Sequence, residues 1–304
     1  MNILNLEGLK TVGQVAPNTI INADCLEAMK YIADKSIDCI ICDLPYGITD
    51  CKWDTVIPFE PLWEQYKRII KPHGAIALFG SQPFTSALVM SNPKWFKYEW
   101  IWEKPQGTGS FNANKRPLCS HENILVFAAE RNSYYPQKTK AEKLMGDTLP
   151  AKTNLKHTSI YGSSNEYKNK QLWKETGFRH PKTVLKFIKP KQCVFGLYTP
   201  DAEFKHPSKK PLLLIEYLIK TYTLKDELIL DNTAGSGTLA IAAINTDRNY
   251  ICIEKDEHYF EVMRNRIERH DPNAIKPQPK LPKKKLVNDE YIQLSLFNDC
   301  LNGL

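Results

Sequence analysis

Short apolar runs alternate with segments of helical spacing along most of the chain. A strand and turn are predicted at 20–26, and further strands at 37–42, 74–80, 97–104 and 122–130. Helical spacing marks 26–35, 58–71 and 211–223, and strand–turn–helix units cover 226–246 and 249–267. This alternation predicts an α/β fold with a mainly parallel sheet covered by helices on both faces.

The pattern weakens between residues 131 and 205, which are rich in Lys, Asn, Thr, Tyr and Gly. A structureless loop of this length is unusual inside a compact domain, so we expect an inserted lobe. The α/β domain would then consist of residues 1–130 and 206–268. Residues 269–304 are expected to form a flexible basic linker, rich in Pro and Lys, and a C-terminal peptide.

Composition is that of a globular protein and excludes few classes of function. The chain has 42% hydrophobic and 25% charged residues, as ordinary globular proteins do. Its formal net charge of +7 suits a partner that carries phosphates without proving one, and basic residues are dense at 138–191 and 276–285. No apolar stretch approaches the roughly 18 residues that span a bilayer. The first residues lack a secretory pattern, so we expect a cytoplasmic protein without membrane association.

Among the eight cysteines, only Cys39 and Cys42 have the C-x-x-C spacing of a redox or zinc pair. Both lie in an apolar, β-branched segment that is predicted to be a strand. Residues three apart on a strand point to opposite faces, so the two thiols should not converge. We therefore expect neither a metal site nor a redox pair here.

A glycine-rich turn at 235–240, GSGTLA, fits the G-x-G-x-x-G/A pattern between a strand and a helix. Such glycines allow a ligand to approach the backbone at the helix N-terminus. Glu254 follows about 20 residues later at the end of a strand, where its carboxylate can accept hydrogen bonds from ribose hydroxyls. The turn alone leaves NAD, FAD, S-adenosylmethionine and a ligand-free structural turn open.

The segment Asp43-Leu44-Pro45-Tyr46-Gly47 follows a predicted strand and points to one of these chemistries. An amino group on a nucleic-acid base is a poor nucleophile because its lone pair is conjugated with the ring. Two acceptors aimed at its hydrogens favour attack and stabilise the developing positive charge. Asp43 and the Leu44 carbonyl can supply them, Pro45 can hold the turn rigid, and Tyr46 can stack on an extruded base.

In this arrangement of motifs the chain resembles the amino-group (N6-adenine/N4-cytosine) DNA methyltransferases of the β arrangement, in which a D-P-P-Y motif precedes the cofactor glycines. The resemblance covers roughly residues 20–268 and is carried, in order, by INADCLEAM, ICDLPYG, WEKPQGTGSFNANKRPLCSHENILVF, FRHPKTVLKF, HPSKKPLLLIEYLI, DNTAGSGTLA and YICIEKDEHYF. The main departure is Leu44, where the family usually has Pro. Only the backbone carbonyl of that residue is needed, so we expect activity to survive.

The resemblance implies a Rossmann-like S-adenosylmethionine-dependent methyltransferase sheet, with the DLPY and GSG strands side by side. Asp24 and Cys25 would lie at the cofactor adenine and Glu254 at its ribose, with Asp43 also at the cofactor. The methionine side would be lined by Asp231, Ala234, Gly235 and Gly237, and Thr238 would also bind the cofactor. The segment containing His206, Lys209 and Pro211 would close that pocket. Transfer would be direct, with no metal and no cysteine nucleophile.

The resemblance also implies double-stranded DNA as the partner and makes 131–205 the target-recognition region. Arg179, Lys115, Arg116 and the GTGSF loop at 107–111 are the expected DNA contacts. Asp at the first motif position favours N6 of adenine, with N4 of cytosine as the alternative. A nicotinamide-dependent oxidoreductase is the alternative from another class. A homodimer is plausible from the same resemblance.

The C-terminal peptide contains Gln293, Leu294, Leu296 and Phe297 within the sequence QLSLF. It resembles the short peptides by which bacterial proteins bind the DNA sliding clamp, with two apolar anchors and one glutamine at the end of a flexible linker. A terminal helix that packs on its own domain is the alternative. We expect the peptide to bind the clamp.

Overall fold

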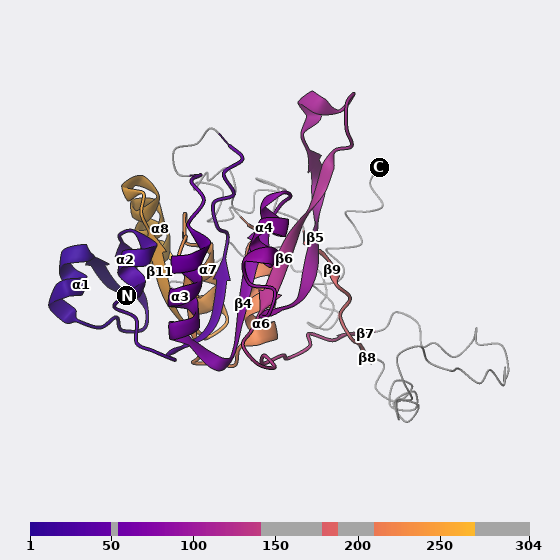
Figure 1. The fold of residues 1–304 in the computed structure, drawn as a ribbon. Coiled ribbons are helices and arrows are strands. Elements are labelled where there is room, and N and C mark those ends of the chain that lie inside the picture. Colours follow the sequence, from indigo (N-terminus) through magenta and orange to yellow (C-terminus); the bar gives the residue numbers. More distant parts are fainter. Residues whose placement is uncertain (50–53, 141–177, 188–209, 271–304) are drawn as a thin grey trace, which may run out of the picture. The chain divides into compact units, whose positions relative to one another are not determined.

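The computed structural model describes residues 1–49, 54–140, 178–187 and 210–270. The chain divides into two units, Met1–His270 and Asp271–Leu304, and all described residues belong to the first. That unit is built on a nine-stranded sheet of order β1-β2-β11-β10-β3-β4-β6-β5-β9 (Figure 1). Its strands are β1 (Asn2–Asn5), β2 (Thr19–Asn22), β3 (Ile37–Cys42), β4 (Ile70–Gly80), β5 (Phe96–Thr108), β6 (Cys119–Phe127), β9 (Val184–Lys186), β10 (Leu228–Asp231) and β11 (Asn249–Glu254).

Strand direction agrees with the predicted parallel sheet. Neighbouring strands are parallel except where β6 pairs with β4 and with β5. The strand before the DLPY turn, β3, lies beside the strand before the glycine turn, β10, with Ile229 opposite Cys39 and Leu230 opposite Ile40. This pairing of β3 with β10 was expected from the resemblance, and it brings the ends of both strands to the same edge of the sheet.

Helices cover both faces of the sheet (Figure 1). One core contains side chains from α1 (Leu6–Val12), α2 (Cys25–Met29), α3 (Phe59–Ile69) and α4 (Phe84–Ser91). The other contains side chains from α6 (Leu212–Tyr222), α7 (Thr238–Asn245) and α8 (Glu257–Arg269). Cys39 belongs to the second core and Cys42 to the first, so the two thiols lie on opposite faces as predicted.

Several elements differ from the expected ones, and β1, α1 and α4 were not predicted at all. The helix predicted at 26–35 ends at Met29, because the next turn tightens into bonds from Tyr31 to Ala28 and from Ile32 to Met29. This tighter turn buries Ile32. The strands predicted at 97–104 and 122–130 are the two halves of one antiparallel hairpin, with β5 extending to Thr108.

A short strand from the predicted insert contributes to the main sheet. Within 131–205, β9 pairs in parallel with β5, and the indole N–H of Trp102 donates to the Phe187 carbonyl at 3.1 Å. A separate two-stranded sheet joins β7 (Thr139–Lys140) and β8 (Phe178–Arg179). No helix in the described part of the chain is long and apolar enough to cross a membrane.

Candidate active site at the carboxyl edge of the sheet

A cavity of about 1430 Å³ opens where the parallel strands end. From β3 the chain crosses to β4 on one side, and from β10 it crosses to β11 on the other, so the crossovers diverge between β3 and β10. Such a switch point is where open α/β sheets bind ligands. Most of the residues predicted for the site line this cavity: Asp24, Cys25, Asp43, Leu44, Pro45, Tyr46, Arg116, Asp231, Ala234, Gly235, Thr238 and Glu254.

The turn that follows β3 is fixed by contacts on both sides of Asp43. The Tyr46 hydroxyl donates to Asp43 Oδ1 at 2.7 Å, and the Thr233 hydroxyl donates to the Asp43 carbonyl at 3.1 Å. Leu44 is buried in the core on the α1–α4 face, and the Tyr46 ring stacks on Phe84 with ring centres 5.0 Å apart. The turn is therefore tied through its backbone to the segment that follows β10 and through the Tyr46 ring to α4.

Asp54 holds the other end of the same turn. Its carboxylate accepts hydrogen bonds from the backbone N–H groups of Gly47 at 2.8 Å, Ile48 at 2.9 Å and Thr49 at 2.8 Å. Burial opposes ionisation of this carboxyl, but the N–H donors outweigh it and lower the pKa of Asp54. Gly47 has φ +68°, and a Cβ atom there would lie 2.8 Å from the Val56 side chain, so glycine is required.

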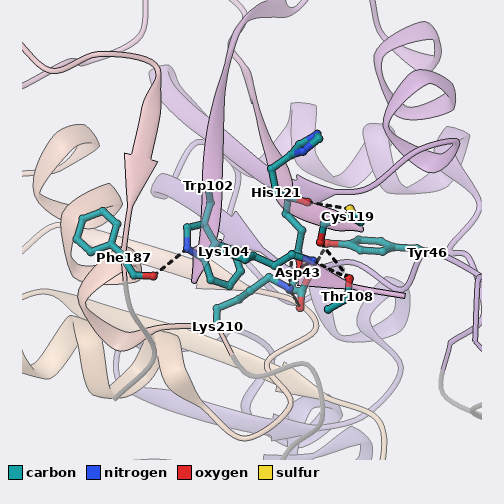
Figure 2. A network of polar contacts seen from close by, with 10 residues as sticks. Asp43, Tyr46, Trp102, Lys104, Thr108, Cys119, His121, Phe187 and Lys210 are labelled. Atoms are coloured by element: carbon teal, nitrogen blue, oxygen red, sulfur yellow. Dashed lines mark hydrogen bonds and ion pairs between the residues drawn. The ribbon is translucent and has the colours of Figure 1, made fainter. Parts of the chain in front are cut away.

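A buried lysine occupies the centre of the site (Figure 2). Lys210 Nζ lies 2.6 Å from Asp43 Oδ2 and 3.1 Å from Glu122 Oε2, and its side chain is only 8% exposed. Lys104 pairs with the other oxygen of Glu122 at 3.5 Å. Burial disfavours the ammonium form, but the negative charges of Asp43 and Glu122 outweigh it and raise the pKa of Lys210. Lys210 is therefore a charged group at neutral pH.

Sequence reasoning selected the neighbouring lysine and missed Lys210. The two lysines are adjacent in HPSKKP, and nothing in the residue types says which of them points into the domain. His206 and Lys209 lie outside the described residues. Pro211 is buried and precedes α6 as its N-cap, and it is not among the residues that line the cavity. Glu122, on β6, is a second site residue that the sequence did not indicate.

The glycine turn and Glu254 form one hydrogen-bonded unit. Gly235 has φ +50°, and its N–H donates to Glu254 Oε2 at 2.7 Å, while the Asp256 N–H donates to Oε1 at 2.8 Å. Gly237, with φ +74°, begins α7, and a Cβ atom there would lie 2.6 Å from the Met263 side chain. Gly237 thus serves the packing of α7 against α8, whereas Gly235 and Glu254 line the cavity.

Asp24 and Cys25 lie at the end of β2 on the other side of Glu254. The Asp24 carboxylate caps α2 by accepting the Leu26 N–H at 3.0 Å and pairs with Lys255 at 3.1 Å. Burial raises the pKa of the Cys25 thiol to about 11. This cysteine is protonated at neutral pH, so it is a poor nucleophile.

The residues predicted to contact DNA fall in two places. Arg116 and Lys115 belong to the hairpin between β5 and β6, and Arg116 also lines the cavity. Arg179 is exposed on β8 in the separate two-stranded sheet and does not line the cavity. The C-terminal residues Gln293, Leu294, Leu296 and Phe297 lie outside the described residues.

Ionisation of Asp231, at the end of β10, lowers the stability of the folded protein, and this effect can be measured. Burial, together with the nearby charges of Asp43 and Glu254, raises the pKa of Asp231 to about 7. In the unfolded chain this carboxyl loses its proton near pH 4. Between these pH values the folded protein holds a proton that the unfolded chain has released, so the free energy of unfolding falls as pH rises from about 4 to about 7.

The substitution Asp231→Asn removes this ionisation. We expect the variant to be more stable than the unaltered protein at pH 8, by up to about 4 kcal/mol, with a smaller difference at pH 5. Urea denaturation at both pH values measures the change. Asp247→Asn is the control, because Lys225 lowers the pKa of this exposed carboxyl and the variant should gain no stability at pH 8. An Asp231→Asn difference that is the same at both pH values would contradict the assignment.

Comparison with known proteins agrees with the geometry of the site. The type II methyltransferase M.HinfI of Haemophilus influenzae is 27% identical to this chain over 328 residues, covering 94% of the chain and 81% of that relative. The type II methyltransferase M2.MboI of Moraxella bovis is 26% identical, covering 83% of the chain and 88% of that relative.

Solved structures show the same fold. A crystal structure of an M1.HpyAVI–SAM complex has a TM-score of 0.53 and 22% identity, covering 81% of this chain and 98% of that one. The cytosine-N4-specific PvuII DNA methyltransferase has a TM-score of 0.57 and 15% identity, covering 96% and 95%. A family model described as DNA methylase, N6_N4_Mtase, matches residues 37–265, which include Asp43, Lys210 and Glu254. The chain belongs to this family of DNA methylases.

Proposed function

We propose that this protein methylates an exocyclic amino group of a base in double-stranded DNA, N6 of adenine, with S-adenosylmethionine as the methyl donor. The observation that carries the proposal is that the Asp43 turn and the Gly235–Glu254 unit open into one cavity. Family membership favours this chemistry over the nicotinamide-dependent oxidoreductase that a glycine-rich turn alone leaves open.

The residues around the glycine turn fit this cofactor by their chemistry. Each Glu254 oxygen already accepts one backbone N–H and keeps a further lone pair for a ribose hydroxyl. Asp231 offers a carboxylate for the ammonium group of the methionine end, and Asp24 and Cys25 line the side assigned to the adenine. Bound S-adenosylmethionine supplies an electrophilic sulfonium methyl group for direct in-line transfer to the base nitrogen.

Asp43 and Leu44 act on the amino group of the base. An acceptor on each N–H turns the nitrogen lone pair away from conjugation with the ring and stabilises positive charge as it develops. Asp43 Oδ1 accepts a hydrogen bond from the Tyr46 hydroxyl, and Oδ2 accepts one from the Lys210 ammonium group. Each oxygen can still accept a further hydrogen bond. The target base must leave the DNA duplex to reach this turn, and Tyr46 lines the cavity that would receive the extruded base.

Lys210 and Glu122 position the catalytic carboxylate. The buried ammonium group of Lys210 offsets part of the negative charge that Asp43, Asp231 and Glu254 bring to one cavity. Glu122, on β6, holds the same ammonium group through its Oε2 atom at 3.1 Å. Asp43 can therefore stay in one orientation while the base and the methyl donor bind.

The choice of adenine rests on Asp at the first position of the motif, and N4 of cytosine is the alternative. A structural neighbour is described as cytosine-N4-specific, but its 15% identity shows only a shared fold. We assign recognition of the DNA sequence to residues 131–205, inserted into a catalytic domain of 1–130 and 206–268. Arg179, Lys115 and Arg116 are proposed to contact the DNA.

The proposal is tested by incubating the protein with S-adenosylmethionine and unmethylated DNA and identifying modified nucleosides by mass spectrometry. We expect N6-methyladenine from the unaltered protein and at least about 100-fold less from Asp43→Ala, because one of the two acceptors is lost. Sequencing of the same DNA would give the recognition site. Asp247→Asn, an exposed change that no described contact links to the cavity, should remain active.

Each alternative has its own outcome in this experiment. N4-methylcytosine would retain the mechanism and change the base. Full activity of Asp43→Ala would contradict the role of the turn. Absence of any methylated base, despite binding of S-adenosylmethionine, would contradict DNA as the substrate.

We further propose that the C-terminal peptide QLSLF, at 293–297, binds the bacterial sliding clamp and so recruits the enzyme to newly replicated DNA. Titration of the full chain with a purified clamp should show saturable binding, and a Leu296→Ala/Phe297→Ala variant should lose it because both apolar anchors are gone. Equal binding by the variant, or no binding by the unaltered chain, would contradict the proposal. Sedimentation of the free protein in the same series would test the homodimer.

A further inference from the structure

We propose that Phe111 is a wedge that enters the base stack of duplex DNA at the position vacated by the target base. The inference rests on the proposed function and adds a role in base extrusion to it. Phe111 lies in the short 3₁₀ helix Ser110–Asn112, at the end of the β5–β6 hairpin. Three properties of this hairpin carry the argument: its position, its charge and the exposure of Phe111.

The hairpin projects from the same edge of the sheet as the active site (Figure 1). The ladder between β5 and β6 is interrupted after Glu103, and the two strands pair again only at Thr108 and Cys119. Thr108, Gly109, Arg116 and Pro117 all line the cavity that contains the Asp43 turn. DNA that delivers a base into this cavity would therefore pass along the hairpin.

Phe111 is fully exposed, at 103% of its reference surface. The backbone that presents it is nevertheless hydrogen-bonded, with Asn112 N–H donating to Gly109 at 2.9 Å, and with both Lys115 and Arg116 donating to the Asn112 carbonyl at 2.9 and 3.0 Å. Among the described residues, no other large hydrophobic side chain is so exposed. An aromatic ring held out on an ordered tip is suited to contact a partner.

The charge at the end of the hairpin fits a polyanion as the partner. From residue 105 to 121 the sequence contains Lys115 and Arg116 and no acidic residue, whereas Lys104 already pairs with Glu122. Cations can neutralise backbone phosphates, while an exposed ring can take up the stacking that neighbouring bases lose when one base leaves. A peptide partner could contact the ring but would not require the two cations, Lys115 and Arg116, that follow it.

The test compares two duplexes that carry the mapped recognition site. In one, the target base is paired normally. In the other it lies opposite an abasic position, where extrusion requires no base pair to be broken. We expect Phe111→Ala to slow single-turnover methylation of the paired duplex by about tenfold or more and to leave the abasic duplex within about threefold of the unaltered rate.

Two further variants make the outcome specific. Phe111→Trp keeps a stacking ring and should restore the rate on the paired duplex. Leu224→Ala removes a side chain that is 51% exposed just before β10, outside the cavity, and should not change either rate.

The proposal is overturned if Phe111→Ala leaves the paired duplex unaffected. It is also overturned if both duplexes lose rate equally, as they would if Phe111 served packing, dimer formation or general DNA affinity. Failure of the proposed function gives a different result, because the unaltered protein would then methylate neither duplex. The proposed role of Phe111 would be contradicted together with that function.

Discussion

The ion pair between Lys210 and Asp43 is the contact on which the catalytic geometry depends. It joins the start of α6 to the end of β3, and Glu122 adds a third partner from β6. Taking a lysine out of water is costly unless its charge is matched at close range, so the buried ammonium group of Lys210 depends on Asp43 and Glu122. This ion pair fixes the orientation of the Asp43 carboxylate by joining it to a residue outside the turn.

Around this pair the cavity collects negative charge. Asp24, Asp43, Asp231 and Glu254 all line it, at the ends of β2, β3, β10 and β11. Parallel strands that end together account for this convergence, because each strand places its following residue at the same edge. Burial, and to a smaller extent the charges of Asp43 and Glu254, raises the pKa of Asp231, so its ionised form is unfavourable in the protein alone. Such a site gains stability when a cationic ligand binds, which suits a sulfonium cofactor that also carries an ammonium group.

Strand periodicity allowed the α/β sheet and the opposed faces of Cys39 and Cys42 to be predicted. The pairing of β3 with β10 was predicted only through the resemblance to the amino-group DNA methyltransferases. The sequence did not distinguish Lys210 from Lys209, because burial of one of two adjacent lysines depends on how the chain enters α6. Glu122 escaped notice because its partners come from residues distant in sequence. The extent of the β5–β6 hairpin was also missed, since a strand pattern does not show whether the chain returns beside itself.

A double-mutant cycle on Lys210 and Asp43 tests the central claim most directly. The free energy of unfolding would be measured by urea denaturation for the unaltered protein, Lys210→Met, Asp43→Asn and the double variant. If the ion pair stabilises both groups, Lys210→Met should destabilise the unaltered protein by at least about 1 kcal/mol more than it destabilises the Asp43→Asn variant. In the Asp43→Asn variant the carboxylate that Lys210→Met would leave unpaired is already absent. Additive effects, within about 0.5 kcal/mol, would contradict the account.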